Sequence, residues 1–288
     1  MRALRVDVDT YLKEALDRHL DKADGKTPSN LAEAIRYSLL GPGKRIRPRL
    51  LLACAEMVKI SDQVAVPAAA ALEMLHCFTL IHDDLPCMDN DDFRRGRPSN
   101  HKQYGEGIAL LAGDALMALC VETFLDSSDH VPHPLLLRGL SRLIWAMGPR
   151  GVTGGQAAEA LLSPQSKLEE LSTMHEKKTG ALFSASLLIP MDFAGIKEDS
   201  SQGVALELFA KELGLSFQVV DDLDDESEGV AADPKSILFY VDRKSAQNNT
   251  LMRLDAAIKS LSSNWGDAAV PLLQIATEVS KKLEIPGS

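Results

Sequence analysis

Five aspartates and two arginines follow a long apolar stretch in the first third of this sequence. Asp83 and Asp84 come at the end of that stretch, and Pro86 stops a helix there, because proline lacks a backbone N–H and its ring meets the preceding turn. We therefore expect both acids at a helix C-terminus, where the helix dipole and their mutual repulsion are unfavourable unless a cation lies nearby. Carboxylate oxygens suit Mg²⁺, and arginines such as Arg94 and Arg95 grip phosphate oxygens. The pattern favours a site for Mg²⁺ and a phosphorylated substrate; a solvated acidic loop beside two basic residues is the alternative.

A second group of acids stands far along the chain, again after an apolar stretch. Asp221 and Asp225 are four residues apart and therefore share one face of a helix, with Asp222 beside them. Gly229 is suited to end that helix. Two helix ends that each carry several carboxylates predict the two walls of one metal cage.

The composition is that of an ordinary globular chain. Its 288 residues suffice for one large domain, with 45% hydrophobic and 25% charged residues. The net charge of −10 argues against nucleic acid or anionic lipid as a partner, so an anionic substrate needs a local basic pocket. Four cysteines without a CxxC pair indicate reduced thiols and predict a cytoplasmic protein. We expect no integral membrane segment, because no apolar run approaches about 20 residues. Strand signals are nearly absent, which predicts an all-α architecture.

The two acidic segments carry a resemblance to a known family. The segment DDLPCMD (83–89), followed by RRG (94–96), and the segment DDLDD (221–225) resemble the two aspartate-rich motifs of trans-isoprenyl diphosphate synthases. Matching stretches run from Gly41 to about Asp225 in the family's order. The resemblance implies a single domain over residues 1–288, a large helical bundle with a central cavity (the isoprenoid synthase fold), and a homodimer. It also implies three Mg²⁺ ions held by Asp83, Asp84, Asp89, Asp221, Asp222 and Asp225.

The resemblance assigns roles to further residues. The segment GPGKRIRP (41–48) opens a helix with basic side chains, which alone is either an anion site or a solvated basic turn. It is similar to the family's GGKRxRP, with Pro42 in place of a glycine, so Lys44 and Arg47 are expected on isopentenyl diphosphate. The family pattern adds His76 and Arg95 to that diphosphate. Roles beside the allylic diphosphate and the reacting carbon are implied for Arg94, Lys178, Thr179, Phe217 and Gln218.

Two places depart from the family pattern. Gln156 matches the family's GGQ, but the usual aspartate a few residues later is Glu159, which leaves this carboxylate without an assigned role. After Asp225, the family's Gly-Lys and further lysine are missing, and Lys235 and Lys244 are the two candidates to replace them.

The activity implied by the resemblance is the head-to-tail condensation of isopentenyl diphosphate with an allylic diphosphate, dimethylallyl or geranyl, with release of diphosphate. Phe78, five residues before Asp83, is expected to form the floor of the product cavity. In the family, an aromatic residue there together with a first motif that is two residues longer is typical of farnesyl diphosphate synthases, so the resemblance favours farnesyl diphosphate. The likeness of LIHDDLPCMDNDD to geranylgeranyl diphosphate synthases keeps the twenty-carbon product open. Two competing interpretations are a class I terpene cyclase, which needs no second diphosphate site, and a non-catalytic regulatory subunit.

Overall fold

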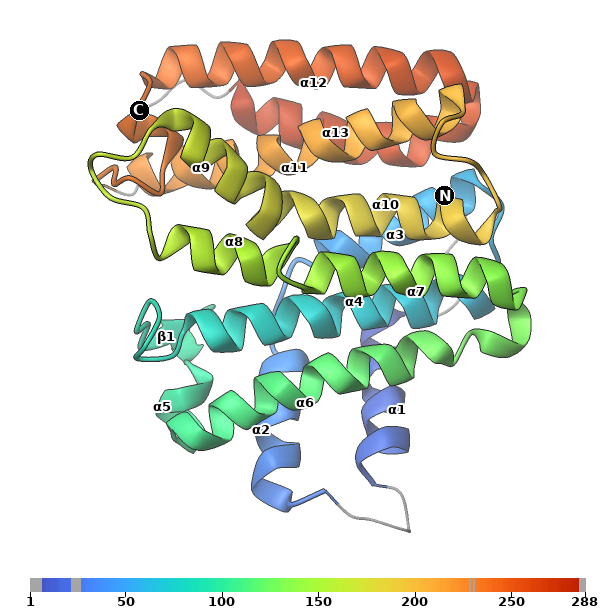
Figure 1. The fold of residues 1–288 in the computed structure, drawn as a ribbon, viewed down its shortest axis with the longest axis vertical. Coiled ribbons are helices and arrows are strands. Elements are labelled where there is room, and N and C mark those ends of the chain that lie inside the picture. Colours follow the sequence, from blue (N-terminus) through green and yellow to red (C-terminus); the bar gives the residue numbers. More distant parts are fainter. Residues whose placement is uncertain (1–6, 22–26, 228, 230, 285–288) are drawn as a thin grey trace.

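The computed structural model describes residues 7–21, 27–227, 229 and 231–284, and its architecture is all-α, as predicted (Figure 1). One short antiparallel pair, β1 (Phe93–Arg94) with β2 (Arg97–Pro98), interrupts the helices of the described residues. A π-helical turn, Glu176–Gly180, joins α9 to α10. The α-helices are α1 (Val8–Leu20), α2 (Ser29–Leu39), α3 (Ile46–Met57), α4 (Asp62–Asp83), α5 (Asn100–Tyr104), α6 (Glu106–Leu125), α7 (His133–Met147), α8 (Val152–Glu159), α9 (Leu168–His175), α10 (Ala181–Phe193), α11 (Ser201–Ser227), α12 (Arg243–Trp265) and α13 (Val270–Leu283).

Two hydrophobic clusters form the core, and α10 has residues in both. Leu182 and Ile189 of α10 belong to the cluster built mainly from α1, α2, α4 and α6. Leu187 and Met191 belong to the cluster built mainly from α3, α11, α12 and α13. A helix that is apolar on all sides has to be buried on all sides, so the sequence of α10 places it between the two halves of the bundle.

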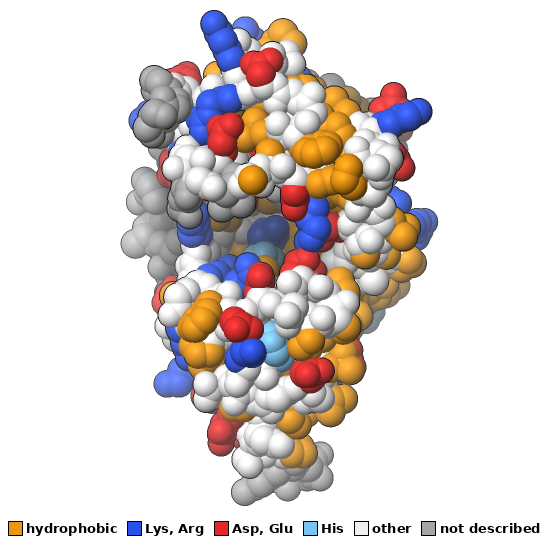
Figure 2. Space-filling view, turned by 90° about the vertical axis from the view of Figure 1, so that its left-hand side faces the viewer, with side chains coloured by type: hydrophobic (Ala, Val, Ile, Leu, Met, Phe, Trp, Pro, Cys, Tyr) orange, Lys and Arg blue, Asp and Glu red, His pale blue; other side chains and the backbone are white. Residues whose placement is uncertain are grey.

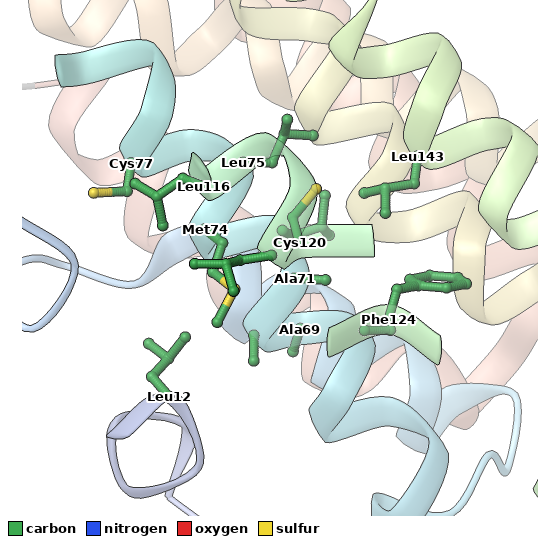
Figure 3. Close-up of a cluster of buried hydrophobic side chains, with 14 of the residues drawn as sticks. Leu12, Ala69, Ala71, Met74, Leu75, Cys77, Leu116, Cys120, Phe124 and Leu143 are labelled. Carbon is green, nitrogen blue, oxygen red and sulfur yellow. The ribbon is translucent and has the colours of Figure 1, made fainter. Parts of the chain in front are cut away.

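The α4 helix packs along α6, and their contact contains much of the first cluster (Figure 3). Met74 and Leu75 of α4 and Leu116 and Cys120 of α6 are buried there. By length and composition alone, α4 and residues Glu106–His130 are long and apolar enough to cross a membrane, although charged residues such as Glu73 and Asp114 interrupt both stretches. The apolar window of α4 is 89% buried inside the protein, so the packing of the bundle accounts for its composition.

The helix ends that carry the acidic motifs lie on one side of the molecule. The C-terminal ends of α4, α8 and α11 all point to the left side of Figure 1. α4 ends at Asp83, as Pro86 predicts, and α11 continues to Ser227, two residues past the second motif. The bundle thus brings together acidic helix ends that are separated by more than a hundred residues of sequence.

Gly113 of α6 provides a test of the α4–α6 packing. A Cβ atom at this position would lie 2.1 Å from Nε2 of His82, which makes a hydrogen bond with the carbonyl oxygen of Leu110 at 3.1 Å. We expect Gly113→Ala to lower the free energy of unfolding by about 1–3 kcal/mol, because the imidazole has to move and its hydrogen bond is lost. Urea denaturation measures this change.

Gly107→Ala is the matched control on the same helix. A Cβ atom there meets nothing within 4 Å, so this variant should be neutral or more stable by up to about 1 kcal/mol through helix propensity. Equal stabilities of the two variants would contradict the close approach of His82.

Candidate active site

The first acidic motif divides its aspartates between two sets of partners. Asp83 is buried; its Oδ1 accepts a hydrogen bond from Gln156 at 3.0 Å, and its Oδ2 lies 3.4 Å from the ammonium of Lys178. Asp84 is also buried but is held by Arg94, whose Nε donates to it at 2.8 Å. Burial raises the pKa of Asp84 even though Arg94 acts to lower it. Asp83 and Asp84 are therefore not equivalent.

Glu159 joins the first motif and was missed as a site residue in the sequence. The backbone N–H of Asp89 donates to the carbonyl oxygen of Asp83 at 2.9 Å, which folds the loop back over the helix end. One carboxylate oxygen from each of Asp83, Asp89 and Glu159 then lies within 4.8 Å of the other two. Three carboxylates from separate segments are a donor set that fits a hard divalent cation. The position of Glu159, three residues after Gln156 at the end of α8, was the available signal.

The π-helical turn holds Lys178 and Thr179 at the centre of the site. Lys178 forms ion pairs with Glu159 and Asp83. Burial acts to lower the pKa of Lys178, but these carboxylates outweigh it and the pKa is raised. A Cβ atom on Gly155 would lie 2.3 Å from the backbone nitrogen of Lys178, so only glycine lets α8 approach this turn. Single π turns of this kind inside helices are frequent at functional sites.

A chain of polar contacts links this turn to the second motif. The Thr179 hydroxyl donates to Oε1 of Gln218 at 3.1 Å, and Nε2 of Gln218 donates to Oδ1 of Asp222 at 3.1 Å. The other oxygen of Asp222 accepts from the backbone N–H of Ile237 at 2.7 Å. Desolvation raises the pKa of Asp221 to about 6, against the charge of Lys44.

Two adjoining cavities meet at Gln218. The first, of about 240 Å³, is lined by carboxylates and lysines: Glu159, Lys178, Asp222, Asp225 and Lys235. The second, of about 520 Å³, is lined on its basic side by Lys44, Arg45, Arg47, His76 and Arg95. Gln218 lines both cavities, Thr179, Phe217 and Asp221 line the second, and Lys178 lines the first. Figure 2 views this side of the molecule, where basic side chains and a histidine lie deep in a hollow that acidic side chains surround.

The basic cavity holds arginines in two different states. The guanidinium of Arg45 is already paired with acids of the protein, because it forms ion pairs with Glu73 at 2.7 Å and Asp9 at 2.8 Å. Arg47 instead lies over the ring of Phe183, and its buried Nε has no hydrogen-bond partner among the described residues. Burial lowers the pKa of Arg47 to about 10. An arginine in this condition is ready to receive an anion.

Pro42, the departure from the family's glycine, is accommodated in this cavity. Its carbonyl oxygen accepts a hydrogen bond from Nη1 of Arg95 at 3.0 Å. The next residue, Gly43, leaves room for the same guanidinium, since a Cβ atom there would lie 2.5 Å from Nη1. His76 lies beside these arginines, and burial together with their charge lowers its pKa well below the usual value. His76 is therefore a neutral ring in a cationic cavity.

The structure also separates several sequence candidates. Lys235 reaches the site, with its ammonium 2.8 Å from Oδ1 of Asp89, whereas Lys244 is exposed at the start of α12. Asp221 lines the basic cavity, whereas Asp222 and Asp225 line the acidic one. Phe78 is buried one turn before Asp83, edge-on to the His82 ring at 5.5 Å, and is not among the described residues that line either cavity.

Comparison with known proteins places the chain in a family. The model of the polyprenyl synthetase family matches residues 28–237. The chain belongs to the polyprenyl synthetase family. Among its relatives, the large subunit 1 of a heterodimeric geranylgeranyl pyrophosphate synthase, chloroplastic, from Arabidopsis thaliana is 44% identical over 74% of this chain. A farnesyl diphosphate synthase from Geobacillus stearothermophilus is 40% identical over 77% of this chain.

The coverage of these relatives differs. The chain spans 58% of the length of the Arabidopsis protein and 76% of the length of the Geobacillus protein. A geranyltransferase structure from Legionella pneumophila superimposes with a TM-score of 0.85 and 29% identity, covering 96% of this chain and 97% of that one. An FPP/GFPP synthase structure from Zymomonas mobilis gives a TM-score of 0.84 and 31% identity, covering 95% and 96%. The all-α polyprenyl synthetase fold therefore extends over nearly the whole chain.

His175 lines the acidic cavity, and its burial there can be tested through the pH dependence of stability. It is buried at the end of α9, and its Nε2 lies 3.1 Å from the carbonyl oxygen of Lys235. Burial lowers its pKa from 6.5 to about 4, against the hydrogen bond to Lys235. Between these two values the unfolded chain binds the proton and the folded protein does not, so stability falls as the pH drops from about 6.5 towards 4. His175→Gln keeps a donor without a titrating group and should remove this loss, which is at most about 3 kcal/mol.

Urea denaturation of both proteins at neutral pH and near pH 4.5 measures the effect. The exposed His130, changed to Gln, is the control and should keep the wild-type pH dependence. A His175→Gln variant that follows the same pH profile as the wild type would contradict a neutral, buried His175.

Proposed function

We propose that this protein is a short-chain trans-prenyltransferase that condenses isopentenyl diphosphate head-to-tail with dimethylallyl or geranyl diphosphate. The observation that carries the proposal is the pair of adjoining cavities, one with carboxylates and lysines, the other with arginines, which meet at Thr179 and Gln218. Two diphosphate groups bound in these cavities would place their prenyl carbons at the junction. Such positioning of two reactants accounts for a large part of the catalysis of a condensation.

The acidic cavity is the proposed site of the allylic diphosphate. The first-motif side would hold Mg²⁺ through Asp83, Asp89 and Glu159. The second-motif side would hold it through Asp222 and Asp225 together with Asp221, which lines the adjoining basic cavity, for three ions in all. When bound, Mg²⁺ supplies charge stabilisation for the departing diphosphate. Lys178 would donate to the same oxygens, and Asp84 would hold Arg94 in position beside them.

The basic cavity is the proposed site of isopentenyl diphosphate. Lys44, Arg47 and Arg95 would bind its phosphates, with neutral His76 as a further hydrogen-bonding group. The Thr179 hydroxyl, the Gln218 carbonyl oxygen and the ring of Phe217 would face the developing allylic cation and stabilise it with their dipoles and π electrons. The double bond then attacks the cation, and the departing diphosphate takes the proton that is lost. Excluding water from the junction prevents quenching of the cation to an alcohol.

The basic cavity also distinguishes a prenyltransferase from a cyclase and from a regulatory subunit. A class I terpene cyclase needs one diphosphate site, and the cavity around Arg47 would then have no ligand. A non-catalytic subunit would not need Lys178, Thr179 and Gln218 to converge on the acids. Neither alternative accounts for both features, because a cyclase leaves the basic cavity without a ligand and a regulatory subunit leaves Lys178, Thr179 and Gln218 without a role in catalysis.

Farnesyl diphosphate is the proposed product, because buried Phe78 lies on α4 just before the motif. Geranylgeranyl diphosphate is the second candidate, since the Arabidopsis relative is named a geranylgeranyl pyrophosphate synthase and the Geobacillus relative a farnesyl diphosphate synthase.

The unpaired state of all four cysteines supports a reducing compartment, and we propose the cytoplasm. The Arabidopsis relative is named as chloroplastic. Imaging of a tagged protein tests the compartment, and a signal confined to an organelle would overturn it.

We infer that the protein forms a homodimer through α6 and α7, which both lie at the front of Figure 1. Large apolar side chains are exposed on both helices, namely Leu110, Leu111, Leu137, Ile144 and Trp145. Exposed apolar side chains on two helices favour association with another protein surface, and most protein oligomers are symmetric copies of one chain. Light scattering at micromolar concentration tests this, and a monomer would contradict it.

A mass-resolved product assay tests the function. With geranyl diphosphate, isopentenyl diphosphate and Mg²⁺, we expect farnesyl diphosphate and an equal amount of inorganic diphosphate. Arg95→Met should raise the KM for isopentenyl diphosphate more than the KM for geranyl diphosphate, because Arg95 lines the basic cavity and not the acidic one. A cyclic hydrocarbon formed from the allylic diphosphate alone would identify a cyclase, and the absence of any turnover would support the regulatory subunit.

A second prediction concerns product length. Phe78 lines neither cavity, but a prenyl chain that extends from the junction along α4 would meet its ring. Phe78→Ala should therefore lengthen the product by a five-carbon unit, because the smaller side chain removes that obstacle. Phe78→Tyr keeps a ring at the same place and should leave the product unchanged. Mass spectrometry of the products reads out both variants, and an unaltered chain length in a folded Phe78→Ala protein would remove Phe78 as the determinant.

A further inference from the structure

The ring of Phe183 contacts the guanidinium of Arg47 in the basic cavity. Phe183 is buried near the start of α10, and the centroid of its ring lies 5.3 Å from Cζ of Arg47. Both residues line the basic cavity. A guanidinium over an aromatic face within about 6 Å of its centroid is a cation–π contact. Because α10 follows the π-helical turn directly, this ring is placed by the same turn that carries Thr179.

Arg47 needs a group that stabilises its charge. Its buried Nε has no hydrogen-bond partner among the described residues, and Glu73, which lines the same cavity, is paired with Arg45. Burial lowers the pKa of Arg47 to about 10, and the charge of Arg95 acts in the same direction. The π face of Phe183 is a group in direct contact with Arg47 that favours the charged guanidinium.

An aromatic ring supports an arginine in a way that a carboxylate cannot. Glu73 and Asp9 occupy N–H donors of Arg45 and offset its charge. An aromatic face attracts a guanidinium through its quadrupole, without adding a negative charge and without accepting a conventional hydrogen bond. Arg47 therefore keeps both its charge and its donors for an anion that enters the cavity.

The ring of Phe183 is held from the side of α11. Its centroid lies 5.0 Å from that of Phe217, with the two rings tilted by 43°. A Cβ atom on Gly214 would lie 3.2 Å from Cβ and Cγ of Phe183, so α11 packs closely against this side chain. Phe217 also lines the basic cavity. One ring thus contacts both the arginine and a second aromatic residue of the same cavity.

We propose that Phe183 is a positioning residue for isopentenyl diphosphate, because its ring holds the guanidinium of Arg47 and joins it to Phe217. This inference rests on the proposed function of the basic cavity. In that reaction the diphosphate would bind Arg47, and the double bond would lie near Phe217 at the junction of the cavities. A single support for both contacts would fix the two ends of the substrate relative to each other, which is the kind of positioning that a condensation needs.

Fluorination of the ring at position 183 tests the proposal. Site-specific incorporation of mono-, di- and trifluorophenylalanine withdraws electron density from the ring face while its shape changes little. The affinity for isopentenyl diphosphate, measured by calorimetry with a chelator present, should fall with each fluorine and be about tenfold weaker for the trifluoro ring. Phe183→Leu removes the π face and should weaken binding by a similar factor. The fluorinated series keeps the packing of the ring, so the test does not depend on the folding of Phe183→Leu.

The same fluorinated series at Phe209 is the matched control. Phe209 is fully buried in the same hydrophobic cluster as Phe183 but is not among the described residues that line either cavity, so binding should not change. Binding of a non-ionising allylic diphosphate analogue with Mg²⁺ should also stay the same throughout the Phe183 series. An affinity for isopentenyl diphosphate that does not respond to fluorination at Phe183 would overturn this proposal and leave the proposed function standing. A wild-type protein that binds no isopentenyl diphosphate would overturn both.

Discussion

Carboxylates gathered at the C-terminal ends of helices are the constraint on which this structure depends. The helix dipole is negative at such an end and the acids repel one another, so the folded protein needs cations at the same place. It supplies them from three segments: Arg94 beside Asp84, Lys178 beside Asp83, and Lys235 beside Asp89. Each cation comes from a different part of the chain. Neutralising the acids therefore requires the β1–β2 hairpin, the π-helical turn and the loop before α12 to meet at the end of α4.

Close backbone approaches set the geometry at this meeting point. Gly155 lets α8 contact the π-helical turn, and Gly43 lets the Arg95 guanidinium lie against the loop before α3. Lys178 and Thr179 are neighbours on the turn, and Lys178 lines the acidic cavity while Thr179 lines the basic cavity. α10 continues from this turn into both hydrophobic clusters, which anchors the reacting centre in the core of the bundle. The same helix, α10, thus contributes to the hydrophobic core and fixes the position of the site.

Much of the site was predictable because its chemistry is local in sequence. Pro86 fixes the end of α4, and the arginines that follow the acids return to them through a short hairpin. Glu159 was not assigned because one carboxylate at a helix end has no pattern that distinguishes a ligand from a solvated acid. Lys235 could not be separated from Lys244 because a loop has no periodicity from which to place a side chain. The division of Asp221 and Asp225 between two cavities depends on how α11 packs, which spacing along one helix does not determine.

In the proposed reaction, the two cavities bind two diphosphates by different means, one through carboxylate-bound metal and lysine, the other through arginine. Calorimetric titration of isopentenyl diphosphate and of a non-ionising allylic diphosphate analogue, each with Mg²⁺ and with a chelator, tests this difference. We predict that the chelator abolishes binding of the allylic analogue and leaves the affinity for isopentenyl diphosphate nearly unchanged. Equal dependence of both ligands on Mg²⁺ would contradict the division of the site into a metal-dependent and an arginine-dependent half.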